Sequence, residues 1–327
     1  MRLIGLTTIL TLSVILAPLP VEAQPAGKVP RVGYLEPGVG GSGTPFFEAF
    51  RQGLVDLGWV EGQNIAIELR TAEGKYERLP DLAAELVRLK VDVIFASSTP
   101  AAVAAKRATT TIPIVIGRVA DPVESGIVAS LARPGGNITG WTHQGLELRV
   151  KYLDFLKEAV PGATRIGVLW NPANPIHGPS LKTIEAAAQA LTVELHPVGV
   201  RKPEEIEGAF STLVRKRVQA LTVFQDGMFL ARGPQIVALA ARNRLPAMYA
   251  ATELVRGGGL MGYGVNLPEM YRRGSSFVDR ILKGTKPADL PVEQPTKFEL
   301  VINLKTAKAL GLTIPQSILV RADEIIQ

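Results

Sequence analysis

The sequence predicts an α/β protein with two Rossmann-like lobes, each a parallel sheet flanked by helices. Short apolar segments alternate with amphipathic ones along most of the chain, which is the pattern of strands and helices in turn. Several of the apolar segments are continuous, as expected for strands of a parallel sheet covered on both faces. The alternation runs twice, and 327 residues are more than one hydrophobic core usually supports.

The first run contains four predicted strands with helices between them. The strands are expected at residues 32–35, 64–70, 91–96 and 112–116. The helices are expected at residues 44–57, 79–90, 99–107 and 121–131. Three of these helices open on a capping residue followed by Pro, whose fixed φ suits the first helical turn. These openings are Thr44-Pro45, Thr99-Pro100 and Asp121-Pro122.

The second run repeats the pattern after a turn rich in Gly and Pro. Its strands are expected at residues 165–170, 192–197, 220–224, 246–249, 260–265 and 298–302. Its helices are expected at residues 146–159, 180–191, 203–216, 233–243, 267–282 and 304–310. A Pro-rich stretch at 287–295 is typical of a linker.

The first 23 residues have the pattern of a cleavable signal peptide. Arg2 provides the positive start, Leu3–Leu16 is mostly apolar, and small residues at Val21 and Ala23 precede the expected cleavage site. The alternative is a membrane anchor, but the apolar stretch is short of the roughly 20 residues that span a bilayer. We therefore expect export to the periplasm. The sequence has no Cys, which excludes a lipidated N-terminal Cys.

Composition and motifs argue against several other classes of protein. The formal net charge of +6 is dispersed and aromatic residues make up 6%, which does not favour nucleic-acid binding. The three His residues lack metal-ligand spacing, so no metal site is predicted. The sequence lacks the G-x-S-x-G nucleophile elbow, so this motif gives no reason to predict an enzyme. Gly38–Gly43 matches a dinucleotide-binding pattern, but the helix starts only at Thr44-Pro45, so we interpret the glycines as a loop and expect no cofactor.

Several long strings resemble one family of bacterial ABC-transporter substrate-binding proteins, the group that includes tryptophan- and tyrosine-type binding proteins. They span nearly the whole chain after the signal peptide. The strings are Leu57–Asn64, Asp121–Val123, Ser130–Gly140, Gly258–Met261 with Tyr263-Gly264, and Pro287–Pro295.

The resemblance implies a type I periplasmic-binding architecture with a hinged cleft between the lobes. Lobe 1 would comprise residues 29–140 and 260–286, and lobe 2 residues 141–259 and 296–327, with 287–295 as linker. Chain crossings are expected near 139–144, near 261–266 and in the linker. The protein would be a monomer that captures a small solute and delivers it to permease subunits in the inner membrane. A periplasmic ligand sensor that signals to a membrane receptor, and an exported enzyme, stay open as alternatives.

The candidate ligand-binding residues lie mostly where predicted strands end, because ligands of open α/β sheets sit beyond the carboxyl ends of the strands. Ser and Thr donors at a helix start would suit a ligand carboxylate, and Asp would suit an ammonium group. Asn offers donor and acceptor groups, and the aromatic residues offer a packing surface. The candidates are Glu36, Ser97, Ser98, Thr99, Asp121, Trp170, Asn171, Asn174, Asp226 and Tyr263.

Several candidates also have a purely structural interpretation. Ser98 or Thr99 could simply cap the following helix, and Asp121 could do the same before Pro122. Trp170 could lie partly in the core, and Asn171 could belong to a turn at the strand end.

Overall fold

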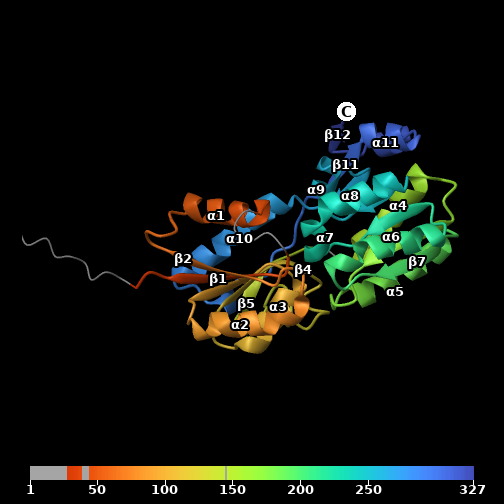
Figure 1. Cartoon of the computed structure of the whole chain (residues 1–327). Helices are drawn as coiled ribbons and strands as arrows, with labels where there is room; N and C mark the ends of the chain where they lie inside the picture. Colours follow the sequence, from red (N-terminus) through yellow and green to blue (C-terminus); the bar gives the residue numbers. More distant parts are fainter. Residues whose placement is uncertain (1–27, 39–43, 144–145) are drawn as a thin grey trace, which may run out of the picture.

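The computed structural model describes residues 28–38, 44–143 and 146–327, which form two lobes with one sheet each (Figure 1). The predicted signal peptide and most of the Gly38–Gly43 loop lie outside these ranges. No helix in the described ranges is long and apolar enough to cross a membrane.

Lobe 1 is built on a five-stranded, fully parallel sheet with the strand order β2-β1-β3-β4-β5. Its strands are β1 (Arg31–Glu36), β2 (Ala66–Thr71), β3 (Val93–Ala96), β4 (Ile114–Ala120) and β5 (Ile138–His143). Its helices are α1 (Pro45–Asp56), the 3-10 turn η2 (Tyr76–Arg78), α2 (Leu79–Arg88), α3 (Thr99–Ala108) and, from later in the chain, α10 (Leu267–Leu282). Helices α1 and α10 lie together on one face, and α2 and α3 on the other (Figure 1).

Lobe 2 is built on a seven-stranded sheet with the order β12-β11-β10-β9-β8-β6-β7. Its strands are β6 (Arg165–Trp170), β7 (Glu194–Gly199), β8 (Ala220–Val223), β9 (Ala247–Tyr249), β10 (Met261–Gly264), β11 (Glu299–Asn303) and β12 (Glu324–Ile326). Its larger helices are α4 (Leu146–Ala159), α5 (His177–Ala190), α6 (Ile206–Arg215), α8 (Gly233–Arg242) and α11 (Leu304–Leu310). Its short helical segments are η3 (Pro203–Glu205), α7 (Gly227–Ala231), α9 (Thr252–Arg256) and α12 (Gln316–Leu319), and η4 (Pro287–Asp289) lies in the linker. Strand β11 runs antiparallel to β10, and the remaining pairs are parallel.

Both faces of each sheet are buried, which explains the continuous apolar strands. In β3, Phe95 packs toward α1 and α10, whereas Ile94 packs toward α2 and α3. In β6, Val168 belongs to the core under α4 and α5, and Leu169 to the core under α6 and α8. Successive strand residues point to opposite faces, so a strand buried on both sides must be apolar at every position.

The chain passes between the lobes three times, and this corrects two expected boundaries. Residues 141–143 were expected in lobe 2, but they end β5 in the sheet of lobe 1. The stretch 260–286 was expected in lobe 1, but β10 pairs with β9 and β11 in the sheet of lobe 2, and only α10 joins lobe 1. The second crossing therefore falls between β10 and α10. Within the linker, Glu293 pairs with Trp141 beside β5, so the linker also extends the edge of the lobe 1 sheet.

Most of the predicted helices and strands form within a few residues of their expected bounds. Helix α1 begins as expected, with Thr44 Oγ1 accepting a hydrogen bond from Phe47 N at 3.2 Å. The helix expected at 121–131 is wrong, because residues 122–126 form turns. Asp121 has a left-handed φ of 42° and Gly126 one of 64°, which a helical start does not allow. Strands β5 and β12 and helices α7, α9 and α12 were not predicted.

Candidate functional site

The polar residues at the carboxyl ends of the two sheets face each other across the junction of the lobes. Between them lies a cavity of only about 10 Å³, room for a single water molecule. Lobe 1 contributes the end of β3, the end of β4 and the end of β5, and lobe 2 contributes α4 and the loops after β6 and β8. The side chains that line the cavity include Ser98, Thr99, Arg118, His143, Arg149, Asn174, Ile176, Gln225 and Asp226. The two lobes therefore leave almost no space between them at this cavity.

The wall from lobe 1 begins with three consecutive hydroxyl residues after β3. Ser98 caps α3, its Oγ accepting a hydrogen bond from Ala101 N at 3.3 Å, so the structural interpretation holds for this residue. Thr99 Oγ1 accepts from Ala120 N at 3.1 Å and ties α3 to β4. Ser97 turns away from the cavity, and its hydroxyl donates to Glu36 Oε2 at 2.8 Å. Ser98 and Thr99 thus line the cavity, and Glu36 holds Ser97 behind them.

Arg118 lies at the centre of the wall from lobe 1. It is 4% exposed and has a left-handed φ of 54°, at a point where the register of β4 against β5 shifts. Its Nε donates to the carbonyl of Ser97 at 3.3 Å, whereas its Nη1 has no hydrogen-bond partner among the described residues. Burial acts to lower the pKa of this guanidinium, but the neighbouring Tyr271 and Glu36, with further acidic groups, raise it above its usual value. The group is therefore a permanent cation in the cleft.

Asp226, after β8, is the most heavily bonded acid of the wall from lobe 2. It is 2% exposed and caps α7, with Oδ1 accepting from Met228 N at 3.0 Å. Asn171 Nδ2 donates to the same oxygen at 3.4 Å, and Asn174 Nδ2 donates to Oδ2 at 3.0 Å. The structure thus brings three of the predicted residues into direct contact.

His177 holds this wall from behind. Its Nδ1 accepts a hydrogen bond from Asn171 N at 2.9 Å, so its Nε2, 3.0 Å from the Gln225 carbonyl, carries the proton. Burial lowers the pKa of His177 to about 4, against the opposing effect of Asp226. A neutral imidazole in one tautomer therefore fixes the loops that follow β6 and β8.

The two walls meet through one buried hydrogen bond. Tyr76, in η2 of lobe 1, donates its hydroxyl proton to Asp226 Oδ1 of lobe 2 at 2.7 Å. Burial, followed by the charge of Asp226, raises the pKa of Tyr76 well above its usual value, so the phenol stays protonated. This contact gives Asp226 its fourth donor.

A second charged contact crosses the cleft beside the first. Arg149 of α4 lies over the ring of Phe224, 4.3 Å from its centroid. Burial lowers the pKa of Arg149 to about 10, and the carboxylate of Asp121, from lobe 1, opposes that shift. Nearby, burial and the charge of Arg149 lower the pKa of His143 to about 3, so this imidazole is neutral.

Two predicted residues lie away from the cavity. Trp170 is half-buried at the end of β6 and packs against the core of lobe 2. Tyr263 of β10 lies between Phe155 and Phe298 and lines a separate cavity of about 410 Å³ in lobe 2. Both aromatic rings therefore pack within lobe 2, outside the cavity of about 10 Å³.

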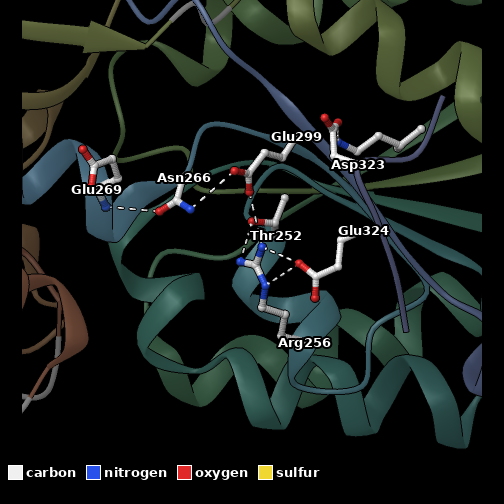
Figure 2. Close-up of polar contacts among 8 residues, drawn as sticks. Thr252, Arg256, Asn266, Glu269, Glu299, Asp323 and Glu324 are labelled. Atoms are coloured by element: carbon white, nitrogen blue, oxygen red, sulfur yellow. Dashed lines mark hydrogen bonds and ion pairs between the residues drawn. The ribbon is translucent and has the colours of Figure 1, made fainter. Parts of the chain in front are cut away.

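The second crossing is braced by a polar network on lobe 2 (Figure 2). Arg256 of α9 donates to Glu324 of β12 at 2.7 Å and to Glu299 of β11 at 3.3 Å. Glu299 in turn accepts from Asn266 Nδ2 at 3.4 Å, and Asn266 caps α10 through Glu269 N. The network joins strands β11 and β12 to the start of α10, where the chain enters lobe 1.

Sequence reasoning missed four residues of the site: Tyr76, Arg118, His143 and Arg149. One signal was present for Arg118, since it is a single cation in the otherwise apolar segment 112–120. Tyr76 and Arg149 carry no local signal, because their partners lie far away in the sequence. No group of three or more potential ligands for a metal occurs in the described part of the chain.

Comparisons with known proteins agree with this geometry. The family model of the ABC transporter substrate binding proteins matches residues 44–326. The tyrosine-binding protein of Clostridioides difficile (strain R20291) is 31% identical over 265 residues, covering 81% of this chain and 76% of the relative. A solved domain from Streptococcus pneumoniae in complex with L-Trp is 26% identical with a TM-score of 0.80, covering 90% of this chain and all of that one.

A third comparison concerns the conformation. An open, ligand-free substrate binding protein with adhesive properties from Clostridium difficile is 27% identical, covering 91% of this chain and all of that one, but its TM-score is only 0.61. Sequence identity is nearly the same as for the L-Trp complex, whose TM-score is 0.80. The overall structure is therefore more similar to the L-Trp complex than to the open, ligand-free protein.

Proposed function

Because the chain belongs to the family of ABC transporter substrate binding proteins, we propose that it is the solute-binding component of an ABC importer. It captures an amino acid or a related small carboxylate in the cleft between its lobes and delivers it to permease subunits in the inner membrane. The observation that carries this proposal is the closed, polar cavity at the carboxyl ends of both sheets. The relative named for tyrosine and the neighbour solved with L-Trp support ligands of this size.

The roles within the cleft follow from the two walls. Ser98, Thr99 and the start of α3 offer hydroxyl groups and the positive end of a helix dipole to a ligand carboxylate. Asp226, held by Asn171 and Asn174, forms the opposite wall. Glu36 and Ser97 support the first wall from behind. Trp170 and Tyr263 have no place in the proposed site.

Ligand binding must involve a hinge motion. A cavity of about 10 Å³ cannot hold an amino acid, so the lobes have to open, admit the solute and close on it. The three crossings supply the hinge, and the cleavable N-terminal segment predicted from the sequence would place the protein in the periplasm as a monomer. The family consists of solute-binding proteins, and the proposed role includes no catalysis.

The test is a thermal-shift panel of amino acids and small organic acids with the mature protein. A ligand present at about 100 times its Kd should stabilise the protein by about 2.7 kcal/mol. Small-angle scattering should show contraction when the same ligand is added. Mass spectrometry of the released ligand should return it unchanged, whereas a converted product would favour an exported enzyme. A panel in which no amino acid or carboxylate shifts the melting curve would contradict the proposal.

A further inference from the structure

We propose that the cleft recognises its ligand through a carboxylate on Arg118, Ser98 and Thr99 and does not require an α-ammonium group. The ligand class would then be small organic acids, with 2-hydroxy acids preferred to the matching amino acids. The inference rests on the proposed function, because it specifies what the same cleft binds.

The first argument is an unused donor. Arg118 lines the cavity, and its buried Nη1 has no hydrogen-bond partner among the described residues. A buried guanidinium N–H without an acceptor is costly, and an oxygen anion in the cavity would satisfy it. The Nε of the same side chain is held by the Ser97 carbonyl, so the guanidinium is already oriented before a ligand arrives.

The second argument is the set of hydroxyl groups beside that donor. Within the described part of the chain, Ser98 Oγ and Thr99 Oγ1 act as acceptors from backbone N–H groups, and neither donates its own proton. Both line the same cavity as Arg118. Three donors from one lobe therefore converge on one place, at the positive end of the ten-residue helix α3.

The third argument concerns the acids, which would have to receive an ammonium group. Asp226 accepts from four protein donors, and three of them belong to its own lobe, so opening the cleft releases only Tyr76. Glu36 accepts from Ser97 Oγ and from Gly38 N, and it does not line the cavity. Asp121 interacts with Arg149 across the cleft. Each acid around the site is thus already engaged by the protein itself.

The remaining polar group of the cavity, the imidazole of His143, suits an uncharged substituent of the ligand. His143 lines the cavity, and its Nδ1 has no hydrogen-bond partner among the described residues. Burial keeps this imidazole neutral, with a pKa of about 3. A neutral ring nitrogen can form a hydrogen bond with a ligand hydroxyl without a charge on either side. An ammonium group there would lose its water, would gain no charge partner in the neutral ring, and would meet in Asp226 an acid already bonded to four protein donors.

The experiment uses two series of ligands that differ only at Cα, with the wild-type mature protein and calorimetry. The indole series is L-tryptophan, indole-3-lactate, indole-3-propionate and tryptamine, and the phenol series is L-tyrosine, 4-hydroxyphenyllactate, 3-(4-hydroxyphenyl)propionate and tyramine. In at least one series the 2-hydroxy acid should bind about tenfold more tightly than the amino acid, because the ammonium is not paired. The amines that lack a carboxylate should not bind.

The variant Arg118→Gln tests the anchor, with Arg118→Lys as the conservative change. Arg118→Gln should weaken binding of the 2-hydroxy acid by about tenfold or more, and Arg118→Lys should retain part of the affinity. Arg70→Gln, which removes a partly exposed arginine that pairs with Glu85 and does not line the cavity, is the matched control and should leave the affinity unchanged. Melting curves establish that each variant is folded.

The outcomes separate the inference from the proposed function. If an amino acid binds about tenfold more tightly than its 2-hydroxy analogue, the inference is overturned while the solute-binding proposal stands. Unchanged affinity in folded Arg118→Gln would overturn it as well. If none of the acids in either series binds, the inference falls, and the broader panel of amino acids and organic acids decides whether the proposed function falls with it.

Discussion

The two walls of the cleft are built in opposite ways. On lobe 2, Asp226 accepts hydrogen bonds from Asn171, Asn174 and Met228 N, and His177 fixes the loops behind it. On lobe 1, Arg118 is held at Nε but keeps Nη1 without a partner among the described residues. In the wall of lobe 2 the hydrogen bonds of Asp226 are all made within the protein, whereas the wall of lobe 1 has a donor without a partner among the described residues.

This difference assigns separate tasks to the lobes. A saturated polar network rigidifies the loops that carry it and offers little to a ligand. An oriented, unpaired donor offers binding energy without the cost of rearrangement. Substitutions in the wall of lobe 2 should therefore act mainly on stability, and substitutions in the wall of lobe 1 mainly on affinity.

The largest expected effect is on stability and comes from Asp226→Ala. The change leaves buried donors of Asn174, Tyr76 and Met228 without their acceptor, so the free energy of unfolding should fall by about 3 kcal/mol in urea titrations. Asp289→Ala, at an exposed acid of the linker, is the control and should cost less than about 0.5 kcal/mol. A loss for Asp226→Ala as small as the control's would mean that the wall of lobe 2 is not a structural network.

Acidification should weaken both walls to a similar degree. His143 and His177 have folded pKa values of about 3 and about 4, below that of a free imidazole near 6.5, so the unfolded chain binds more protons in this window. The contribution of the two neutral imidazoles to the free energy of unfolding is therefore present above about pH 6.5 and is lost as the pH is lowered. Between about pH 7.5 and 5.5 each imidazole should account for a loss of about 1.4 kcal/mol.

Denaturant titrations at both pH values measure this loss in wild type and in His143→Gln. The variant should remove the His143 part of this loss, about 1.4 kcal/mol, since His177 still titrates. An identical pH dependence in both proteins would show that His143 is not buried in its neutral form.

The contact between the walls is tested by Tyr76→Phe. Asp226 keeps its three donors from lobe 2, so the free energy of unfolding should fall by only about 1 kcal/mol. Without ligand, small-angle scattering should show a larger radius of gyration than for wild type, because the closed form loses its buried hydrogen bond. Tyr263→Phe, in the separate cavity of lobe 2, should leave the radius unchanged. Equal radii of gyration for both variants would contradict the proposal that the Tyr76–Asp226 hydrogen bond stabilises the closed form.

The smallest effect is expected for Trp170→Phe. Its ring packs on the core of lobe 2 and does not line the cleft, so calorimetry should give a Kd within about twofold of wild type for the best ligand of the panel. Arg118→Gln, measured in the same way, provides the contrast. A large loss of affinity in Trp170→Phe would indicate that Trp170 contacts the ligand, as predicted from the sequence.

Much of the site could be found from the sequence because its residues follow strands. Ser98, Thr99, Asn174 and Asp226 were predicted from their positions beyond strand ends, and all four line the cavity. Trp170 and Tyr263 were predicted to bind the ligand because their rings offer a packing surface, and Tyr263 also because it lies at an expected chain crossing. These criteria do not specify to which side of a strand end a ring turns.

The sequence by itself determined the local structure: the alternation of strands and helices, the cap of α1 at Thr44, and the cap of α3 at Ser98. These features depend on periodicity and on contacts within a few residues, which any short segment carries with it. Only the tertiary structure decided that Tyr76 meets Asp226, 150 positions later, and that a shift of register in β4 places Arg118 in the cleft. Such contacts depend on how two lobes and two strands are placed against each other, and no local preference encodes that placement.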